Sequence, residues 1–310
     1  MDLSGKRVLV TGGAGLVGSH MADLLAPDND VLVADDLSNG YRDWVPDDAE
    51  FVDVDLTDPD GVSEVVTPDI DAVFHFAASK NVDTDRPREQ FDENNAMTYG
   101  LLERMDEVGV SNLAFTSSST VYGEAPRPTP EDYAPLEPIS IYGASKLAEE
   151  GLLSTYAHAH DFTVWTFRFA NIPGPAFDGS VIPDFVEKLD ENPETLTVLG
   201  DGRQEKSYLH VEECVDAIRH VVEHADDAHN VYNLGTRTTT SVNRIADIVA
   251  DEMGVDPDYE YTGGDRGWTG DVPRMRLSVE KLAGLGFEPA DSSDEAVRRA
   301  TRELLEDDLG

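Results

Sequence analysis

Residues 7–18 read RVLVTGGAGLVG, a β-branched apolar run that passes through three spaced glycines into a helical pattern. Such glycines permit a tight turn, a close approach of backbone N–H groups to a pyrophosphate, and close packing of a helix on the preceding strand. The N-terminus of that helix favours negative charge. The stretch predicts a dinucleotide site whose phosphates contact Gly12, Gly15, Leu16, Val17 and Gly18.

An aspartate pair follows the next apolar run. Asp35 comes at the end of that run, about 20 residues after the glycines, where a carboxylate accepts hydrogen bonds from ribose hydroxyl groups. The same charge repels a 2′-phosphate, and Asp36 adds a second negative charge. We therefore predict NAD rather than NADP as the cofactor, with Asn39 in the following loop as a further contact.

Short apolar runs alternate with helical patterns through the first half of the chain. Near-continuous apolar runs are typical of strands buried on both faces of a parallel sheet, and the helices between them provide the crossovers. This order predicts a doubly wound parallel sheet of the α/β class. The expected strands are residues 7–10, 31–34, 51–54, 72–76, 112–117 and 163–169.

From about residue 171 the alternation becomes less regular. We expect a smaller, partly interleaved C-terminal lobe, so the predicted domains are 1–170 for the cofactor and 171–310 mainly for the substrate. Five prolines within residues 125–138 predict an irregular loop, because proline interrupts helices and inner strands. The lobe's expected helices are 182–190, 211–224 and 241–253, and its expected strands are 196–199, 207–209 and 231–234.

Residues at the ends of the other strands complete the predicted cofactor site. Small side chains after the fourth strand leave room for a dinucleotide, and the residues after the third strand lie where an adenine ring would pass. His75 lies inside an apolar run, and we expect it to be packed rather than catalytic. The predicted contacts are Asp55, Leu56, Phe76, Ala77, Ala78 and Phe169.

The segment YGASK places Tyr142 and Lys146 four residues apart on one face of a helix. A nearby ammonium stabilises a phenolate, so we expect Lys146 to lower the pKa of Tyr142 from about 10 toward neutrality and make it a general base. The hydroxyl groups of Ser118, Ser119 and Thr120 follow the fifth strand, at the rim where open α/β sheets bind ligands. One of these hydroxyls is expected to hydrogen-bond a substrate oxygen.

Together these motifs resemble the extended short-chain dehydrogenase/reductases, and within them the NAD-dependent nucleotide-sugar epimerase/dehydratase group. The resemblance covers nearly the whole chain and implies a Rossmann sheet. It rests on TGGAGLVGSH (11–20), ADDLSNG (34–40), FHFAASKNV (74–82), SSSTVYG (117–123), YGASK (142–146), RFANIPGP (168–175), GDGRQEKSYLHV (200–211) and RGWTGDVP (266–273).

The resemblance implies a role for individual residues. Ser118 matches the active-site hydroxyl, Tyr142 the base and Lys146 its partner. Asn95 matches a structural asparagine at the catalytic and cofactor site, and Lys80 a lysine near the cofactor. The implied substrate contacts are Lys80, Ser118, Ser119, Thr120, Tyr142, Asn171, Val181, Arg203, Lys206, Arg266 and Asp271, and no metal is implied.

The position two residues beyond Ser118 separates the reactions of this group. The resemblance implies an acid there in dehydratases and decarboxylases, and this chain has Thr120. The predicted reaction is therefore 4-epimerisation of a UDP-glucose or UDP-galactose type of sugar through a transient 4-keto sugar. A dehydratase, decarboxylase or sugar dehydrogenase of the same family remains an alternative. A non-catalytic NAD-binding regulator is an alternative of another class.

Departures from the family pattern leave the sugar open. Lys206 stands where relatives carry arginine, and the stretch from Arg266 to Asp271 is longer than usual. The cations Arg203, Lys206 and Arg266 could equally form surface ion pairs on an acidic protein. Met275 lies near the family's gate for 2-acetamido sugars, and its adaptable side chain leaves that choice open.

Composition restricts partners and surroundings. The 310 residues include 63 acidic and 23 basic side chains, a net charge of −40, which argues against nucleic acid and membrane as partners. The excess is spread along the chain, which is typical of a halophilic protein in salt that shortens the Debye length to about 3 Å; a simple solubility role is the alternative. With one cysteine, Cys214, and no apolar leader or membrane span, a cytoplasmic location is expected.

The resemblance also implies a homodimer. In the family, helices corresponding to residues 87–108 and 143–160 pair across a two-fold axis as a four-helix bundle. The sequence itself shows only that both segments contain enough apolar residues for such a face. The expected partners are thus a nucleotide-diphosphate sugar and a second copy of the chain.

Overall fold

The computed structural model describes residues 1–80, 86–175, 180–267 and 270–307, and it contains two compact units. Compared with the predicted division at residue 170, residues 122–139 belong to the second unit and residues 215–232 to the first. Unit 1 comprises Met1–Val121, Ser140–Arg168 and Val215–Tyr232, and unit 2 comprises Tyr122–Ile139, Phe169–Cys214 and Asn233–Gly310.

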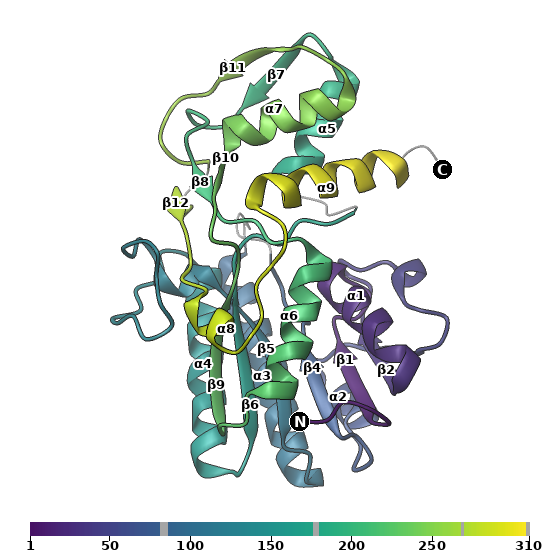
Figure 1. Ribbon diagram of the computed structural model, residues 1–310. Helices are drawn as coiled ribbons and strands as arrows, with labels where there is room; N and C mark the ends of the chain where they lie inside the picture. The colour runs from purple at the N-terminus through teal and green to yellow at the C-terminus, as the bar shows by residue number, and fades with distance from the viewer. Residues whose placement is uncertain (81–85, 176–179, 268–269, 308–310) are drawn as a thin grey trace. The chain divides into compact units, whose positions relative to one another are not determined.

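The sheet of unit 1 has seven strands in the order β3-β2-β1-β4-β5-β6-β9 (Figure 1). All pairings from β3 through β5 are parallel. Because β1 lies between β2 and β4, the strand order reverses beside β1, which is where doubly wound sheets bind ligands. The predicted fold class and six predicted strands are confirmed as β1 (Arg7–Thr11), β2 (Asp30–Asp35), β3 (Glu50–Asp53), β4 (Ala72–His75), β5 (Asn112–Ser118) and β6 (Thr163–Phe169). The strand predicted at 231–234 is present as β9 (His229–Leu234), but it joins this sheet and not a sheet of the C-terminal lobe.

Helices cover both faces of this sheet. One apolar core joins α2, α3 and α4 to the sheet, with Leu9, Val62, Leu102 and Leu153 among its buried members. Figure 1 shows α1 and α6 in front of the strands, on the other face. The helices are α1 (Leu16–Leu25), α2 (Pro59–Val65), α3 (Pro87–Val108), α4 (Ile141–Ala159) and α6 (Val211–His224), with short 3-10 turns at Ala26–Asp28, Arg42–Trp44 and Ser119–Tyr122.

Local sequence explains where these helices begin and end. Gly15 precedes α1 and offers no side chain to cap it, so the cap is left to the backbone. The Ser140 side chain caps α4 by accepting a hydrogen bond from Gly143 N at 3.0 Å. Gly109 ends α3 in the left-handed region, with φ of 82°, which glycine adopts without strain.

Unit 2 is built around a core beneath α5, α7 and α9 that includes Phe185, Ile248 and Val297. Strands β7 and β11 pair in parallel, and β8 lies between β10 and β12. The elements are α5 (Val181–Glu191), β7 (Thr195–Val198), β8 (Glu205–Lys206), β10 (Thr240–Ser241), α7 (Val242–Met253), β11 (Asp258–Tyr261), β12 (Arg274–Met275), α8 (Glu280–Gly284) and α9 (Ser293–Asp307).

One strand prediction in unit 2 is wrong. Residues 207–209 form only an isolated bridge, between Tyr208 and Asn171, and the strand lies just before them at Glu205–Lys206. The apolar Tyr208 and Leu209 are buried as part of a turn into α6 rather than as a strand. The predicted irregular loop at 125–138 is confirmed, since it contains no helix or regular strand.

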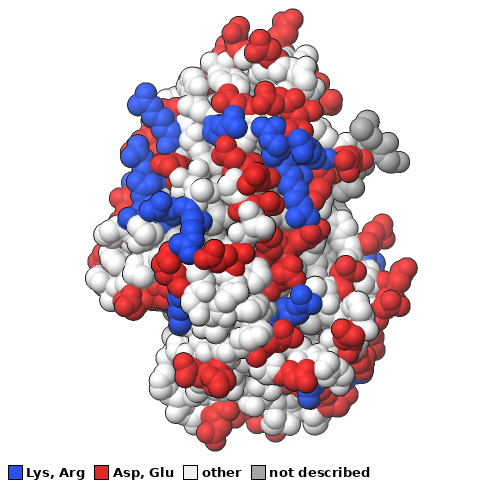
Figure 2. Space-filling view, in the orientation of Figure 1, with Lys and Arg blue, Asp and Glu red and all other residues white. Residues whose placement is uncertain are grey.

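Acidic side chains are distributed over the surface rather than gathered in one patch. Figure 2 shows aspartate and glutamate across the whole visible face, with lysine and arginine confined to a few groups. Many of the arginines are ion-paired, as Arg7 is with Asp30 and Glu50. On this face the acidic side chains of a chain with a net charge of −40 are therefore spread out, as the sequence predicts.

The close packing of α1 on the preceding turn generates a stability prediction. A Cβ at Gly18 would lie 2.1 Å from the Gly12 carbonyl oxygen, whereas a Cβ at Gly151 in α4 would meet nothing within 4 Å. We expect Gly18→Ala to lower the free energy of unfolding by about 1–3 kcal/mol, because backbone must shift. Gly151→Ala, the matched control, should raise it by about 0.5–1 kcal/mol. Urea unfolding in one concentrated-salt buffer measures both, and equal stabilities would contradict the packing described.

Candidate active site

The glycine turn after β1, which we call the glycine cradle, brings segments of backbone close together. Gly12 has φ of 65°, and a Cβ there would lie 2.5 Å from Ala77 N, so only glycine lets the loop after β4 approach. Gly15 N donates to Gly12 O at 3.2 Å, which closes the turn directly before α1. Leu16 and Val17 form the first turn of α1, where the helix dipole favours an anion. The structure thus brings together the residues predicted to hold a pyrophosphate.

Asp35 lies at the end of β2 beside this cradle. Its carboxylate accepts hydrogen bonds from Ala14 N at 3.0 Å and Leu37 N at 2.9 Å, and it is 9% exposed. Burial raises the pKa of Asp35, and the two backbone hydrogen bonds oppose that rise. A carboxylate has about four acceptor positions, so Asp35 keeps capacity for ribose hydroxyls. The cradle and this carboxylate fit the phosphates and adenosine ribose of NAD.

The remaining predicted cofactor contacts differ in exposure. Asp36 and Asn39 are exposed in the loop after β2, and Asp55 is exposed after β3. Leu56 is buried and packs in the core with α2. Phe76, Ala77 and Ala78 are half-buried directly after β4, Lys80 is exposed at the end of that segment, and Phe169 is buried at the end of β6.

Asn94, the neighbour of the predicted Asn95, joins the loop after β4 to α4. Asn94 Oδ1 accepts from Ser79 N at 2.7 Å, and its Nδ2 donates to Ser79 O and to Ser145 Oγ at 3.1 Å. The Asn95 amide instead donates to Phe91 O on its own helix. Successive helix positions point about 100° apart, so only one of two adjacent asparagines can face the sheet. The ENNAM segment contains both asparagines, so the motif alone does not decide which of them faces the sheet.

Ser118 ends β5 with its hydroxyl oxygen already accepting two hydrogen bonds. Thr120 Oγ1 donates to Ser118 Oγ at 2.9 Å, and Thr120 N approaches it at 3.2 Å. Because a hydroxyl has one proton and two lone pairs, the Ser118 proton remains available for an incoming oxygen. The predicted hydroxyl group at the strand end is therefore a hydrogen-bond donor, oriented by Thr120.

Lys146 is buried in unit 1 together with an acid that sequence reasoning missed. Its Nζ lies 3.3 Å from Glu149 Oε1 and 4.6 Å from the centre of the Phe115 ring, and both charged side chains are at most 2% exposed. The spacing of three residues on a helix was the available signal. Lys146 thus has a carboxylate and an aromatic face as its partners.

Tyr142 lies one helical turn before Lys146 and is half-buried. Burial raises the pKa of Tyr142 above its usual value, and the negative charge of Glu149 raises it further. This direction is opposite to the one predicted from the Tyr142 and Lys146 spacing. The physical reason is that burial disfavours the charged phenolate and that Glu149, which the spacing alone does not reveal, adds a negative charge nearby.

A chain of buried hydrogen bonds connects Glu149 to the start of the glycine turn. Thr98 Oγ1 donates to Glu149 Oε1 at 2.7 Å, so the Thr98 oxygen accepts from His75 Nε2 at 3.1 Å. His75 Nδ1 must then accept from Thr11 Oγ1 at 2.7 Å. Each of these side chains is at most 1% exposed. The prediction that His75 is packed in the core agrees with this position.

The neighbouring acid, Glu150, is fully paired. Arg168 Nε and Nη2 donate to its two oxygens at 2.9 and 2.7 Å, and Ser117 Oγ donates at 2.5 Å. Such a bidentate pair with a third donor satisfies a buried carboxylate. This pair anchors α4 to β5 and β6 below the hydroxyl groups of the strand end.

Three predicted substrate residues lie together in unit 2. Lys206 Nζ is 2.6 Å from Asp271 Oδ1, and Arg266 donates to the Asp271 carbonyl oxygen at 2.6 Å and to the Glu124 carboxylate. Gly267 N donates to Asp271 Oδ2 at 3.1 Å. These contacts are the ion pairs that the alternative interpretation of Lys206 and Arg266 expected.

The other predicted substrate residues of unit 2 are more separate. Asn171 bonds to Ser207 O through both its backbone N and its Nδ2, at 3.1 and 3.3 Å. Val181 begins α5 and packs on the unit 2 core, Arg203 is exposed, and Met275 is buried in β12. Asn81, Val82, Trp268 and Thr269, which belong to two of the family motifs, lie outside the described residues.

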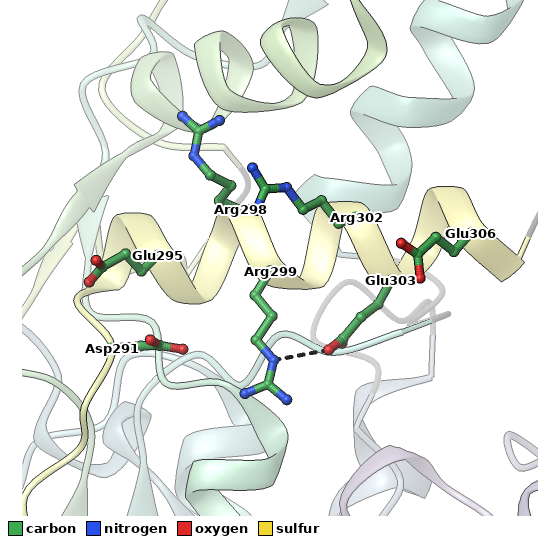
Figure 3. A pocket seen from close by; sticks show the side chains of 7 residues that line it. All are labelled: Asp291, Glu295, Arg298, Arg299, Arg302, Glu303 and Glu306. Atoms are coloured by element: carbon green, nitrogen blue, oxygen red, sulfur yellow. Dashed lines mark hydrogen bonds and ion pairs between the residues drawn. The ribbon is translucent and has the colours of Figure 1, made fainter.

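A cavity of about 320 Å³ in unit 2 is lined by charged side chains of α9 and the turn before it. Figure 3 shows Arg298 and Arg302 on one side of α9 and Arg299 on the other. Arg298 and Arg302 pair with Glu252 of α7, and Arg299 pairs with Glu303 at 3.0 Å. These ion pairs join α7 to α9. None of the predicted site residues lines the cavity.

The described residues contain neither a metal-binding cluster nor a membrane-spanning helix. Within residues 1–80, 86–175, 180–267 and 270–307, no three His, Cys, Asp or Glu side chains are grouped to hold a metal ion. Over the same described residues, every helix is too short or too polar to cross a membrane.

Comparison with known proteins identifies the family. The model of the NAD dependent epimerase/dehydratase family matches residues 8–235. The chain belongs to this family. The predicted family and its dependence on NAD are therefore confirmed at the level that the family name states.

Individual members of the epimerase/dehydratase family are similar over nearly their whole length. A UDP-glucose 4-epimerase of Lactobacillus helveticus is 31% identical over 308 residues, covering 91% of this chain and 92% of its own. A crystal structure of a UDP-galactose 4-epimerase is 38% identical with a TM-score of 0.89, covering 98% of this chain and all of its own. The Thermotoga maritima UDP-glucose 4-epimerase with UDP-glucose is 29% identical, with a TM-score of 0.89, 98% of this chain and 100% of its own.

The buried His75 generates a prediction for stability against pH. Burial, with Lys146 as a second cause, lowers the pKa of His75 to about 3. The unfolded chain therefore binds one more proton than the folded one below about pH 6.5, and stability falls as the pH falls. Replacing His75 should remove about 1.4 kcal/mol per pH unit of this slope between pH 6 and 4.

Urea unfolding at several pH values measures the effect by difference. The slope for His75→Asn is compared with that for the natural chain, so that the many surface carboxylates cancel. His158→Asn, at an exposed position of α4, is the matched control. Equal slopes for the natural chain and His75→Asn would show that His75 takes up its proton in the folded state.

Proposed function

We propose that the protein is an NAD-dependent epimerase that inverts C4 of a nucleoside-diphosphate sugar of the UDP-glucose and UDP-galactose type. One observation carries the proposal: Tyr142 and Lys146 occupy successive turns of α4 in the unit that also contains the Ser118 hydroxyl and the glycine cradle. The relatives described above, whose names state this reaction, support it. Dehydration and decarboxylation would need an acid where this chain has Thr120.

The chain's own groups would move one proton. Bound NAD supplies the oxidant for C4 and the reductant for the return. Tyr142 takes the proton of the sugar 4-hydroxyl and later gives it back, so the same side chain acts as base and acid. Ser118 donates its hydroxyl proton to the same oxygen, because Thr120 occupies its lone pairs. Tyr142 and Ser118 both end the reaction in the protonation state in which they began, as a reaction without net oxidation requires.

We assign the two units different ligands. Unit 1 has the glycine cradle and Asp35 for NAD, which refines the predicted cofactor domain of residues 1–170. In unit 2, Lys206 and Arg266 are the cations proposed for the sugar's diphosphate, together with Asn171, Val181, Arg203 and Asp271. Binding would exchange the contacts of Lys206 and Arg266 with Asp271 and Glu124 for phosphate oxygens. Lys80 and Ser119 complete the proposed contacts.

Assembly and surroundings belong to the same proposal. We propose a homodimer in which α3 and α4 pair with those of a second copy, as the family resemblance implies. We also propose that the enzyme works in the cytoplasm at high salt, because acidic side chains cover the surface and the one cysteine, Cys214, is buried and free. Sedimentation in concentrated salt tests the dimer.

The substrate class is tested with a panel of nucleotide sugars. Holoprotein in concentrated salt is incubated with UDP-glucose, UDP-galactose and their 2-acetamido and uronic counterparts, without added reductant. We expect interconversion of one C4 pair and no accumulation of NADH. A dehydrated or decarboxylated product would contradict the proposed reaction.

The role of Tyr142 is tested by removing one oxygen atom. We expect Tyr142→Phe to reduce kcat about 10²–10⁴-fold, because no other group replaces a positioned acid and base, while bound NAD is retained. Tyr261→Phe, at an exposed tyrosine of β11, is the matched control and should leave kcat unchanged. Interconversion of the panel sugars measures both, and a Tyr142→Phe variant that keeps most of its activity would exclude this residue as the base.

A further inference from the structure

Two adjacent buried carboxylates of α4, Glu149 and Glu150, differ in how their oxygens accept hydrogen bonds. Glu150 uses both oxygens, on the Arg168 guanidinium and the Ser117 hydroxyl. Glu149 places both of its bonds, from Lys146 and Thr98, on Oε1. Its Oε2 is buried and has no hydrogen-bond partner among the described residues. Because such unsatisfied buried groups are rare in native proteins, Glu149 calls for an explanation beyond structural pairing.

Every donor around Glu149 points toward its carboxylate. The single proton of the Thr98 hydroxyl is donated in a hydrogen bond to Glu149. The hydrogen bonds that continue from Thr98 through His75 to Thr11 have the same direction. The Lys146 ammonium approaches from the same helix at 3.3 Å. These contacts stabilise the ionised form of a carboxylate that burial alone would keep neutral.

We propose, building on the proposed function, that Glu149 is a positioning residue that holds the Lys146 ammonium toward the protein interior and so sets the pH at which Tyr142 becomes a base. Lys146 and Glu149 are in contact at 3.3 Å and Tyr142 lies on the preceding turn of the same helix, so the position in which Glu149 holds the ammonium decides how much of its charge acts on the phenol. Glu149 acts through Lys146 and is not itself in the reaction.

The electrostatic surroundings agree with this role. Burial raises the pKa of Glu149, Lys146 and Thr98 oppose the rise, and Glu150 adds to it. The same negative charge raises the pKa of Tyr142. Any change that weakens the ion pair between Lys146 and Glu149 therefore leaves more of the Lys146 positive charge to act on Tyr142.

The other groups that face this pair are neutral or are paired with one another. From β4, His75 stays neutral because its pKa is lowered to about 3. On α4 itself, Glu150 is held by Arg168 of β6. From α3 and β5 come the neutral Thr98 hydroxyl and the Phe115 ring. Titration of Tyr142 thus reports on Lys146 and Glu149.

The test measures the ionisation of Tyr142 directly in NAD-loaded protein. Tyrosinate absorbs in the ultraviolet, so the titration of the natural chain minus that of Tyr142→Phe isolates this tyrosine. The same difference is then taken with Glu149→Gln present in both proteins. We expect Glu149→Gln to lower the titration midpoint of Tyr142 by about 1 pH unit, because it removes the charge that opposes the phenolate and restrains Lys146.

Three further variants separate positioning from folding. Glu149→Asp keeps the charge and should keep the midpoint. Glu64→Gln removes one exposed charge from α2 and is the matched control, expected to leave the midpoint in place. If Glu149→Gln is unstable, Glu149→Leu removes the same charge without burying an unpaired amide, and it should show the same downward shift.

Two readouts keep this proposal distinct from the proposed function. The absorbance titration needs no turnover, so it decides the role of Glu149 even if the panel sugars are not epimerised. Where turnover is observed, the pH at half-maximal kcat/KM should move down by the same amount. A midpoint that stays in place or rises on removal of the Glu149 charge would overturn the proposal.

Discussion

The predicted catalytic residues of unit 1 depend on how the buried Lys146 ammonium is paired. Removing a charge from water costs on the order of several kcal/mol unless the charge is matched. Here the match comes from Glu149 at 3.3 Å and the Phe115 ring at 4.6 Å. Glu149 in turn is bound by Thr98, and Thr98 by His75, so one polar chain crosses an otherwise apolar core and ties α3 and α4 to β4. Tyr142 lies on the same helix, one turn before Lys146.

Much of the fold could be predicted because buried parallel strands are continuous apolar runs. The six strands from β1 to β6 and the glycine turn lie where the sequence predicts them. The short strands β10 and β12 could not be found in this way, since two-residue strands have no periodicity. Helix α9 was not predicted, although its buried residues recur at helical spacing. The strand predicted at 207–209 failed because an apolar turn resembles a strand of the same length.

The site was predicted less completely than the fold. Sequence spacing places Tyr142 and Lys146 on one helix face, but it does not show that Glu149 shares the charge of Lys146. Burial and the charge of Glu149 raise the pKa of Tyr142, whereas the spacing alone predicts that Lys146 lowers it. Likewise, either asparagine of the ENNAM segment satisfied the motif, and only the helix phase shows that Asn94 contacts Ser79 and Ser145. The Asn94 contacts join elements that lie far apart in the sequence, whereas the contact of Lys146 with Glu149 lies within α4.

The central claim is that C4 loses and regains its hydrogen within one protein molecule. The most direct measurement follows a nucleotide sugar labelled with deuterium at C4 through the reaction in ordinary water. The account predicts that the epimer retains the label at C4 and that no NADH is released, because the oxidant and the reductant would be the same bound cofactor and Tyr142 exchanges only the hydroxyl proton. Loss of the label to solvent would contradict the account.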